Sequence, residues 1–489
     1  MTAQKDDFPK ANYRRELFLN QLWQGLNFLS KAAFLGLLTP LMLHVWGPAG
    51  YGMFALASSL LVSLAILDCG IRSLTRLRLC DALAKNDTAD FNLAVCEGVV
   101  AFAWIALAAF IMAVGVALFH GWSRSLNLPA EGDFLIPMTV GLVGLFMSSV
   151  LLLEPLAAQG RVSALKAVNT IGALTAIPVV GLLVWRGCSV TLATFVYFLC
   201  LTLPNVVLLV RVHIQRVGGM DWREWRAPRW HHLTATWHAG GWFYVTTLAL
   251  IAKTHALTFV VSAISGPAVA GTFYILLRIT EFVGGLGATS SDTSLASLAN
   301  EPSPAKRAEN FRHGYLYALI FCLHGTLVLG FLTPLLLSYW LTGPAAHITS
   351  IMAWAMAIYG LSGAFSKVVV NAAMGVSLVR QAAVGNLIEA FLVIASGLVL
   401  QHFLGLTGIF IGATLSAVAL FPASAALARN FRESSAKTWL APIGEQGLLL
   451  LASALVLGAA AWSHQLVLGL AACAFVSALV IFSLKRFHR

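Results

Sequence analysis

The sequence predicts an all-α polytopic membrane protein with about fourteen transmembrane helices, arranged as two parallel six-helix lobes plus two C-terminal helices. Hydrophobic residues make up 59% of the 489 residues, charged residues only 10%, and the mean hydropathy is +0.82. Soluble domains carry about 25% charged residues, so this chain lacks the polar surface that water requires. Long apolar stretches recur along the whole sequence, and two of its turn motifs appear twice.

The spans are predicted to be helices because only helices and closed barrels satisfy backbone hydrogen bonds in lipid. Unbroken apolar runs such as 99–118 and 448–462 lack the alternation of barrel strands. The expected spans are 20–46, 51–71, 93–118, 135–157, 168–185, 190–210, 237–262, 269–290, 314–341, 349–371, 382–402, 406–428, 443–462 and 466–484.

The basic residues predict the orientation of these spans. Of the 31 lysines and arginines, 25 fall in the termini and loops on one side of the membrane, and two, Arg124 and Arg186, fall on the other. Cytoplasmic loops carry the excess of basic residues, so we expect a bacterial inner (cytoplasmic) membrane protein whose N- and C-termini are both cytoplasmic. The four remaining cations lie within spans: Lys31, Lys253, Arg278 and Lys367.

An internal repeat predicts the domain organisation. Gly47-Pro48 after the first span returns as Gly266-Pro267 after the seventh, and Pro204, seven residues before Arg211, returns as Pro422, seven residues before Arg429. Landmarks at nearly one offset indicate duplicated six-helix units, which share an orientation because six is even. We expect a first lobe at 1–211, a cytoplasmic interfacial linker at 212–236 that is rich in Arg and Trp, a second lobe at 237–430, and two additional helices at 431–489.

Charges within the spans are the candidate functional residues. A charge at the bilayer centre costs roughly 2.5–3.5 kcal/mol or more, so it normally faces protein or water. Lys31 and Lys253 lie in repeat-equivalent spans and differ by about one turn when counted from the Gly-Pro turns. Arg278 and Glu281 are three residues apart and share a helix face. The alternatives are a structural Arg278–Glu281 ion pair and, for the lysines, a carbonyl partner or snorkelling.

Other ionisable residues are weaker candidates. Glu389 lies about two turns inside the eleventh span and, with Glu281 and Asp68, is a candidate for ion coupling or for positioning the cations. Asp68, Arg72 and Lys367 lie near cytoplasmic ends of spans, where snorkelling or helix capping also explains a charge.

The sequence lacks motifs for several other chemistries. It contains no GxxxxGK[ST], no HExxH, no GxSxG, and no Cys/His cluster with metal-ligand spacing. We therefore expect no enzyme activity, no cofactor and no metal. The formal charge of +11 is concentrated in the loops and does not indicate a nucleic-acid partner.

Two segments near the N-terminus resemble a known family. The run 47–56, Gly-Pro-Ala-Gly-Tyr-Gly-Met-Phe-Ala-Leu, and the later Leu67-Asp-Cys-Gly-Ile are similar to the opening of bacterial polysaccharide-biosynthesis membrane proteins. These proteins are O-antigen and exopolysaccharide repeat-unit flippases of the multidrug/oligosaccharidyl-lipid/polysaccharide (MOP) exporter superfamily. The motif match is confined mostly to the first eighty residues, whereas the six-plus-six-plus-two layout covers the whole chain.

The resemblance implies a function. Such proteins carry a polyprenyl-pyrophosphate-linked oligosaccharide to the outer leaflet by alternating access, driven by an ion gradient. Its implied partners are this glycan, membrane lipids, and a polymerase with other glycan-assembly proteins. Arg278 and Glu281 look similar to an Arg and acid pair in the eighth span of lipid II flippases, but the first span here carries Lys31 where those carry Arg. Lys31, Lys253 and Arg278 would then replace the hydration of the pyrophosphate, which is prohibitively unfavourable to bury unpaired.

Two other functions stay open. A multidrug or cation exporter of the same superfamily should carry acids at mid-membrane, whereas the charges here are mostly cationic. A membrane glycosyltransferase or polymerase that uses the same lipid-linked sugar should carry a large outer loop, and the predicted outer loops are short.

Overall fold

The computed structural model describes residues 29–63, 87–118, 121–151, 153–158, 162–214, 241–242, 244–300, 304–341, 348–376 and 378–430, with shorter pieces between 19 and 27, 75 and 82, and 453 and 476. These residues form helices joined by turns, and no strand occurs among them. The predicted all-α class is therefore confirmed. The reason is physical: apolar segments of this length meet their backbone hydrogen bonds in lipid only as helices.

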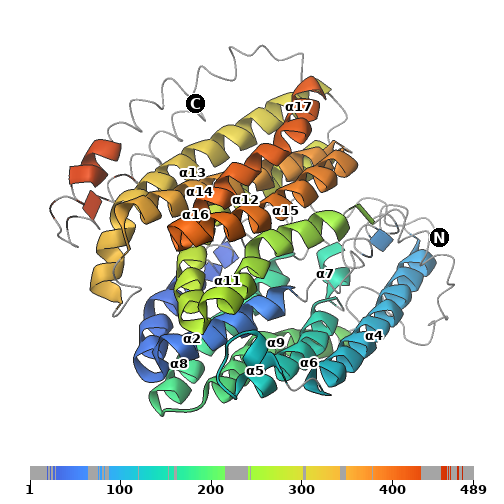
Figure 1. Ribbon diagram of the computed structural model, residues 1–489. Coiled ribbons are helices and arrows are strands. Elements are labelled where there is room, and N and C mark those ends of the chain that lie inside the picture. The colour runs from blue at the N-terminus through green and yellow to red at the C-terminus, as the bar shows by residue number, and fades with distance from the viewer. Residues whose placement is uncertain are drawn as a thin grey trace. The chain divides into compact units, whose positions relative to one another are not determined.

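The elements follow in order along the chain (Figure 1). They are η1 (Phe34–Leu38), α2 (Thr39–Ser63), α4 (Thr88–Leu118), α5 (Trp122–Ser125), α6 (Gly132–Leu151), α7 (Glu154–Ala158), α8 (Val162–Trp185), α9 (Val190–Ile214), η4 (Ala252–Ala256), α11 (Leu257–Ser265), α12 (Pro267–Asn300), α13 (Pro304–Trp340), α14 (Ser350–Gly375), α15 (Val379–Leu404), α16 (Leu406–Ser416), η6 (Ala417–Leu420) and α17 (Phe421–Asn430).

Nine helices within the described ranges are long and apolar enough to cross a membrane, and two further apolar helices are shorter. The first of the nine, Leu29–Ser63, contains both the first and the second predicted spans. Gly47 divides it, with φ 70° and ψ 177°, values that no α-helix contains. The described helices thus follow the first twelve predicted spans, whereas the last two, 443–462 and 466–484, lie mostly outside the described residues.

The chain divides into two compact units. Unit 1 comprises Met1–Tyr244 with Val261–Gly271, and unit 2 comprises Val245–Val260 with Thr272–Arg489. The turn between α11 and α12 therefore belongs to unit 1, although most of both flanking spans belongs to unit 2. The predicted boundaries at 211, 236 and 430 were drawn from sequence landmarks and remain a prediction.

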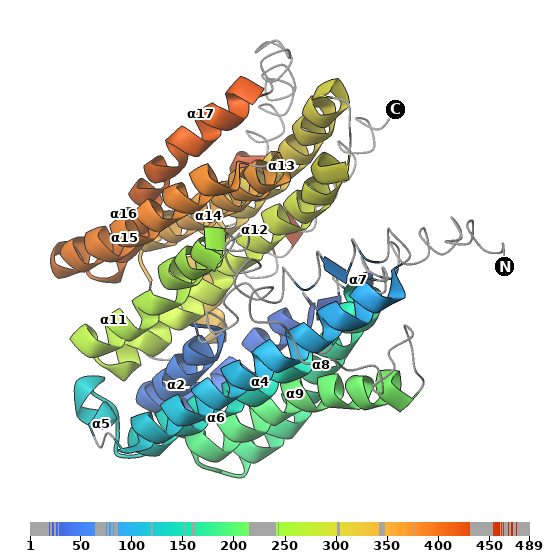
Figure 2. The ribbon, with the colours of Figure 1, turned by 90° about the vertical axis from the view of Figure 1, so that its right-hand side faces the viewer.

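In unit 1, α4 packs along α6 and α8 packs along α9 (Figure 2). An aromatic cluster joins the first two spans to α9: the rings of Phe34 and Phe54 each approach Tyr197, with centroids 5.1 and 5.4 Å away. The start of α12 crosses α2 closely, because a Cβ at Gly52 would lie 1.8 Å from the Pro267 carbonyl oxygen. Only glycine allows this approach.

In unit 2, α13 packs along α14 and α15 packs along α16 (Figure 2). Phe410 of α16 lies at the centre of a second aromatic cluster, 5.5 Å from the Phe273 ring and 5.8 Å from the Tyr359 ring. Phe273 follows Phe54 by 219 residues, so each unit buries the same residue of the repeat. This packing fixes the helices that carry the charged residues described below.

The repeat also appears in the local backbone. Gly47 and Gly266 both have positive φ, 70° and 82°, at the two Gly-Pro turns. A π-helix, in which the turn is wider than in an α-helix, begins at Phe34 in the first span and at Ala252 in the seventh, 218 residues later. Single π-turns within α-helices often mark functional positions. The two π-helices therefore indicate the first and seventh spans as candidate functional regions.

Candidate functional site

Arg278 and Glu281 form an ion pair on one face of α12. The Arg278 Nη1 lies 2.6 Å from the Glu281 Oε2, as the three-residue spacing predicts. The Arg278 Nη2 donates to the Tyr274 hydroxyl at 2.6 Å, and the guanidinium carbon lies 4.6 Å from the centre of the Tyr274 ring. The ring and the carboxylate thus hold the guanidinium from two sides. The Arg278 and Glu281 side chains are 28% and 34% exposed, so the pair is accessible to a ligand.

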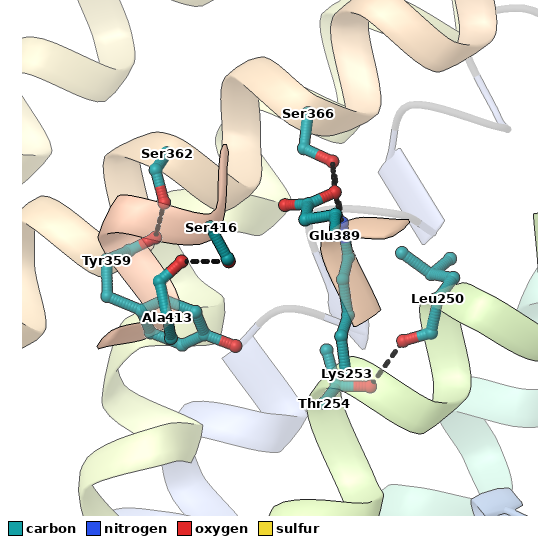
Figure 3. A network of polar contacts seen from close by, with 9 residues as sticks. All are labelled: Leu250, Lys253, Thr254, Tyr359, Ser362, Ser366, Glu389, Ala413 and Ser416. Atoms are coloured by element: carbon teal, nitrogen blue, oxygen red, sulfur yellow. Dashed lines mark hydrogen bonds and ion pairs between the residues drawn. The ribbon is translucent and has the colours of Figure 1, made fainter. Parts of the chain in front are cut away.

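Lys253 and Glu389 form a second, buried ion pair (Figure 3). The Lys253 Nζ of η4 donates to the Glu389 Oε2 of α15 at 2.7 Å and to the Ser366 Oγ of α14 at 2.6 Å. The Ser366 hydroxyl donates to the same carboxylate oxygen at 3.1 Å. The side chains of Lys253 and Glu389 are 6% and 4% exposed. Three spans therefore meet at one closed polar contact.

Two residues of α14 link the pairs electrostatically. Tyr359 interacts with both Glu389 and Glu281, and Lys367 interacts with both Lys253 and Glu281. Lys367 extends from α14 toward α12, because a Cβ at Gly284 would lie 3.6 Å from its Nζ. Three cations and two carboxylates thus share this part of unit 2, which leaves the group with a net positive charge.

His255 lies in the same π-helix as Lys253 and is also buried. It interacts electrostatically with Arg278, Glu281 and Lys367. Its Nδ1 is buried and has no hydrogen-bond partner among the described residues.

The structure thus brings five of the predicted site residues into one cluster of unit 2: Lys253, Arg278, Glu281, Lys367 and Glu389. Lys31 belongs to unit 1, where it precedes η1 by one turn and has an exposed side chain. Asp68 and Arg72 lie outside the described residues. Sequence reasoning missed Tyr274, Tyr359 and Ser366, although Tyr274 has a signal: it lies four residues before Arg278, on the same helix face.

No family model matches this chain, and no curated protein sequence matches it. Solved structures do. The lipid II flippase MurJ in an inward closed conformation matches with a TM-score of 0.70 at 11% identity, over 96% of this chain and 99% of that chain. An inward-facing multidrug resistance MATE family transporter of the MOP superfamily matches with a TM-score of 0.60 at 14% identity, over 85% of this chain and 96% of that one. The eukaryotic MATE transporter AtDTX14 matches at 0.61 and 12%, over 89% and 99%.

This chain shares its fold with MurJ and the MATE transporters. The matches cover nearly the full length of the flippase and of both transporters, so the chain includes the whole of the shared architecture. At 11–14% identity the likeness concerns the fold, and the substrate has to be argued from this chain's own charges.

Proposed function

We propose that this protein is a flippase that translocates a polyprenyl-pyrophosphate-linked oligosaccharide repeat unit from the cytoplasmic to the periplasmic leaflet of the inner membrane. Alternating access of the lobes at 1–211 and 237–430 would move it, with an ion gradient as the energy source. Arg278 carries the proposal: it lies in a helix that is long and apolar enough to span a membrane, and its partly exposed guanidinium is held by Tyr274 and Glu281. A guanidinium binds phosphate oxygens through several N–H donors at once.

The net charge of the cluster supports an anionic cargo. A pyrophosphate loses its hydration in the membrane, and fixed cations replace that hydration. Arg278 and Lys367 exceed the charge of Glu281, while Glu389 neutralises Lys253. The match with a protein named as a lipid II flippase gives the same class of cargo, a lipid-linked glycan, a structural precedent. Unit 1 also has an exposed cation in its first span, Lys31.

The second candidate function is multidrug export, because two of the matching structures are named as MATE transporters. A site for an organic cation requires carboxylates that are not neutralised. In the described part of unit 2, the cluster's carboxylates are each paired with a cation. This pairing favours the flippase.

Complementation of a strain that lacks this protein tests the proposal. We expect Arg278→Ala to lower surface glycan at least about tenfold, since a charge-assisted contact to phosphate contributes about 1.5–3 kcal/mol. Lys31→Ala should be impaired and Lys31→Arg largely active, because the position needs charge more than shape. Lys306→Ala, at an exposed lysine at the start of α13, is the matched control. Normal glycan export by the Lys31→Ala/Arg278→Ala double variant, at normal protein level, would exclude this site.

A purely structural role for the Arg278–Glu281 pair is tested separately. The wild type, Arg278→Met, Glu281→Gln and the double variant are compared for both melting temperature and export. If the ion pair only stabilises the fold, the double variant should recover both stability and export, because neither residue then leaves an unpaired charge. We expect the double variant to fold and to remain inactive, because Arg278 is needed for the pyrophosphate.

A further inference from the structure

The buried contact at Glu389 is built from groups that bind a cation. The Glu389 carboxylate and the Ser366 hydroxyl direct oxygens at one point, from α15 and α14. Carboxylate, hydroxyl and amide oxygens are the ligands that hard cations prefer. The group that occupies this point is the Lys253 ammonium, 2.7 and 2.6 Å from the two oxygens. The ammonium therefore takes the place of a cation from solution.

A further buried oxygen lies on the same helix as Glu389. Asn386 lies three residues before Glu389 on α15, so the two share a helix face. Asn386 is 1% exposed, and neither its amide oxygen nor its amide nitrogen has a hydrogen-bond partner among the described residues. Buried amides without partners are uncommon because their desolvation is unfavourable. The Asn386 amide oxygen therefore remains free of hydrogen bonds within the described residues, as a potential cation ligand would.

Unit 1 shows why Asn386 lacks a partner. Its looser counterpart in the repeat, Asn169, accepts a hydrogen bond from the Asn205 amide at 3.5 Å. Asn205 directly follows Pro204, and the residue that follows the equivalent Pro422 is Ala423. The second lobe thus has alanine where the first has the partner amide. The position equivalent to Lys253, counted at the π-helix offset, is Leu35, so unit 1 has no ammonium at this position.

We infer that Lys253 is a tethered cation: its ammonium occupies the point where the Glu389 and Ser366 oxygens converge, so that the second lobe takes up no metal cation from solution. The charged and titratable neighbours agree with a site that is already neutralised. Tyr359 and Lys367 of α14 interact with the pair, and neither brings a further carboxylate to it. Combined with the proposed flippase function, on which this part rests, the inference predicts export that does not depend on sodium.

Melting temperatures of the purified protein test the site without any transport assay. Wild type and variants are measured in NaCl and in choline chloride at equal ionic strength. We expect equal values for the wild type in the two salts. Lys253→Ala removes the ammonium and leaves space at the carboxylate, so Na⁺ should raise its melting temperature by about 1–2 °C at about ten times the dissociation constant. Lys253→Ala/Glu389→Gln should lose this response.

Two results would overturn the inference. One is a wild type that is stabilised by Na⁺ over choline and loses this response in Glu389→Gln, since a cation from solution would then bind the carboxylate. The other is a folded Lys253→Ala variant that does not respond to Na⁺. If Lys253→Ala does not fold, the melting temperatures of the wild type and Glu389→Gln in the two salts decide, because a Na⁺ response that depends on Glu389 would overturn the inference.

Export in sodium-free medium tests the functional part. Cells in choline medium should export glycan within about twofold of the rate in sodium medium, because removing sodium does not change the driving force if sodium is not the coupling ion. A wild type that stops exporting only when sodium is removed would contradict sodium-independent coupling. Failure to export glycan in either medium would instead overturn the proposed function, and the melting temperatures would still decide about Lys253.

Discussion

The π-helices of the first and seventh spans occupy equivalent positions in the two repeats, yet they carry different chemistry. The first has the sequence FLGLL and the second AKTHA, in which both Lys253 and His255 are buried. In unit 1 the π-helix makes an apolar contact, between Phe34 and Tyr197. In unit 2 the equivalent π-helix carries one partner of an ion pair, Lys253. The difference indicates that the wide turn belongs to the repeated fold, whereas the charges are specific to the second lobe.

Breaking the buried Lys253–Glu389 pair should lower the free energy of unfolding at least as much as any other substitution. Lys253→Met leaves the Glu389 carboxylate buried without its cation, so we expect a loss of about 3–5 kcal/mol in the free energy of unfolding. Lys253→Met/Glu389→Gln should recover most of that stability, because no unpaired charge remains. Chemical denaturation in detergent micelles measures both. Equal stability of the single and double variants would show that the ion pair does not determine the packing of the three spans.

The converse substitution tests the first lobe. Leu35→Lys places a lysine at the position in η1 that is equivalent to Lys253, where Leu35 is 9% exposed. The positions equivalent to Glu389, at the repeat offsets of 219 and 218 residues, are Thr170 and Ile171, so no carboxylate is expected to meet the new charge. We expect a loss as large as that of Lys253→Met. A mild effect would mean that the two π-helices differ less than their side chains suggest.

The glycines of the two repeats should respond unequally. A Cβ at Gly52 would meet the Pro267 carbonyl oxygen at 1.8 Å, whereas a Cβ at Gly271 would meet its nearest atoms at 3.1 Å. Gly52→Ala should therefore lower the free energy of unfolding by about 1–3 kcal/mol, through forced backbone shifts, and Gly271→Ala by less. Gly36→Ala in η1 is the matched control, because nothing lies within 4 Å of its Cβ position. Melting temperatures that rank these variants differently would contradict the close crossing at Gly52.

The amide pair of unit 1 should give the smallest effect. Asn205→Ala removes the donor to Asn169 and makes unit 1 resemble unit 2, where Ala423 stands at the equivalent position. A hydrogen bond of this kind contributes about 0.5–1.5 kcal/mol, and its 3.5 Å length places it at the lower end. Thermal unfolding of Asn205→Ala beside Asn205→Asp measures it. A loss well above this range would show that the amide pair joins α8 to α9 more strongly than its length indicates.

The sequence by itself predicted the fold class and the repeat. Hydropathy determined the helices, because apolar segments in lipid have almost no alternative, and the Gly-Pro turns marked equivalent positions in the two repeats. The Arg278–Glu281 pair was also accessible from sequence, since its partners are three residues apart on one helix, where spacing alone determines distance.

Only the tertiary structure decided the partner of Lys253. Glu389 is 136 residues away, and nothing in the sequence identifies it, rather than Glu281, as the partner of Lys253. The pairing depends on how η4, α14 and α15 pack, and packing joins residues by shape and charge regardless of their distance along the chain. The same holds for Ser366, Tyr359 and Lys367, whose places beside the two ion pairs follow from helix contacts. Composition and spacing therefore determine which helices form, whereas tertiary packing determines which of their charges meet.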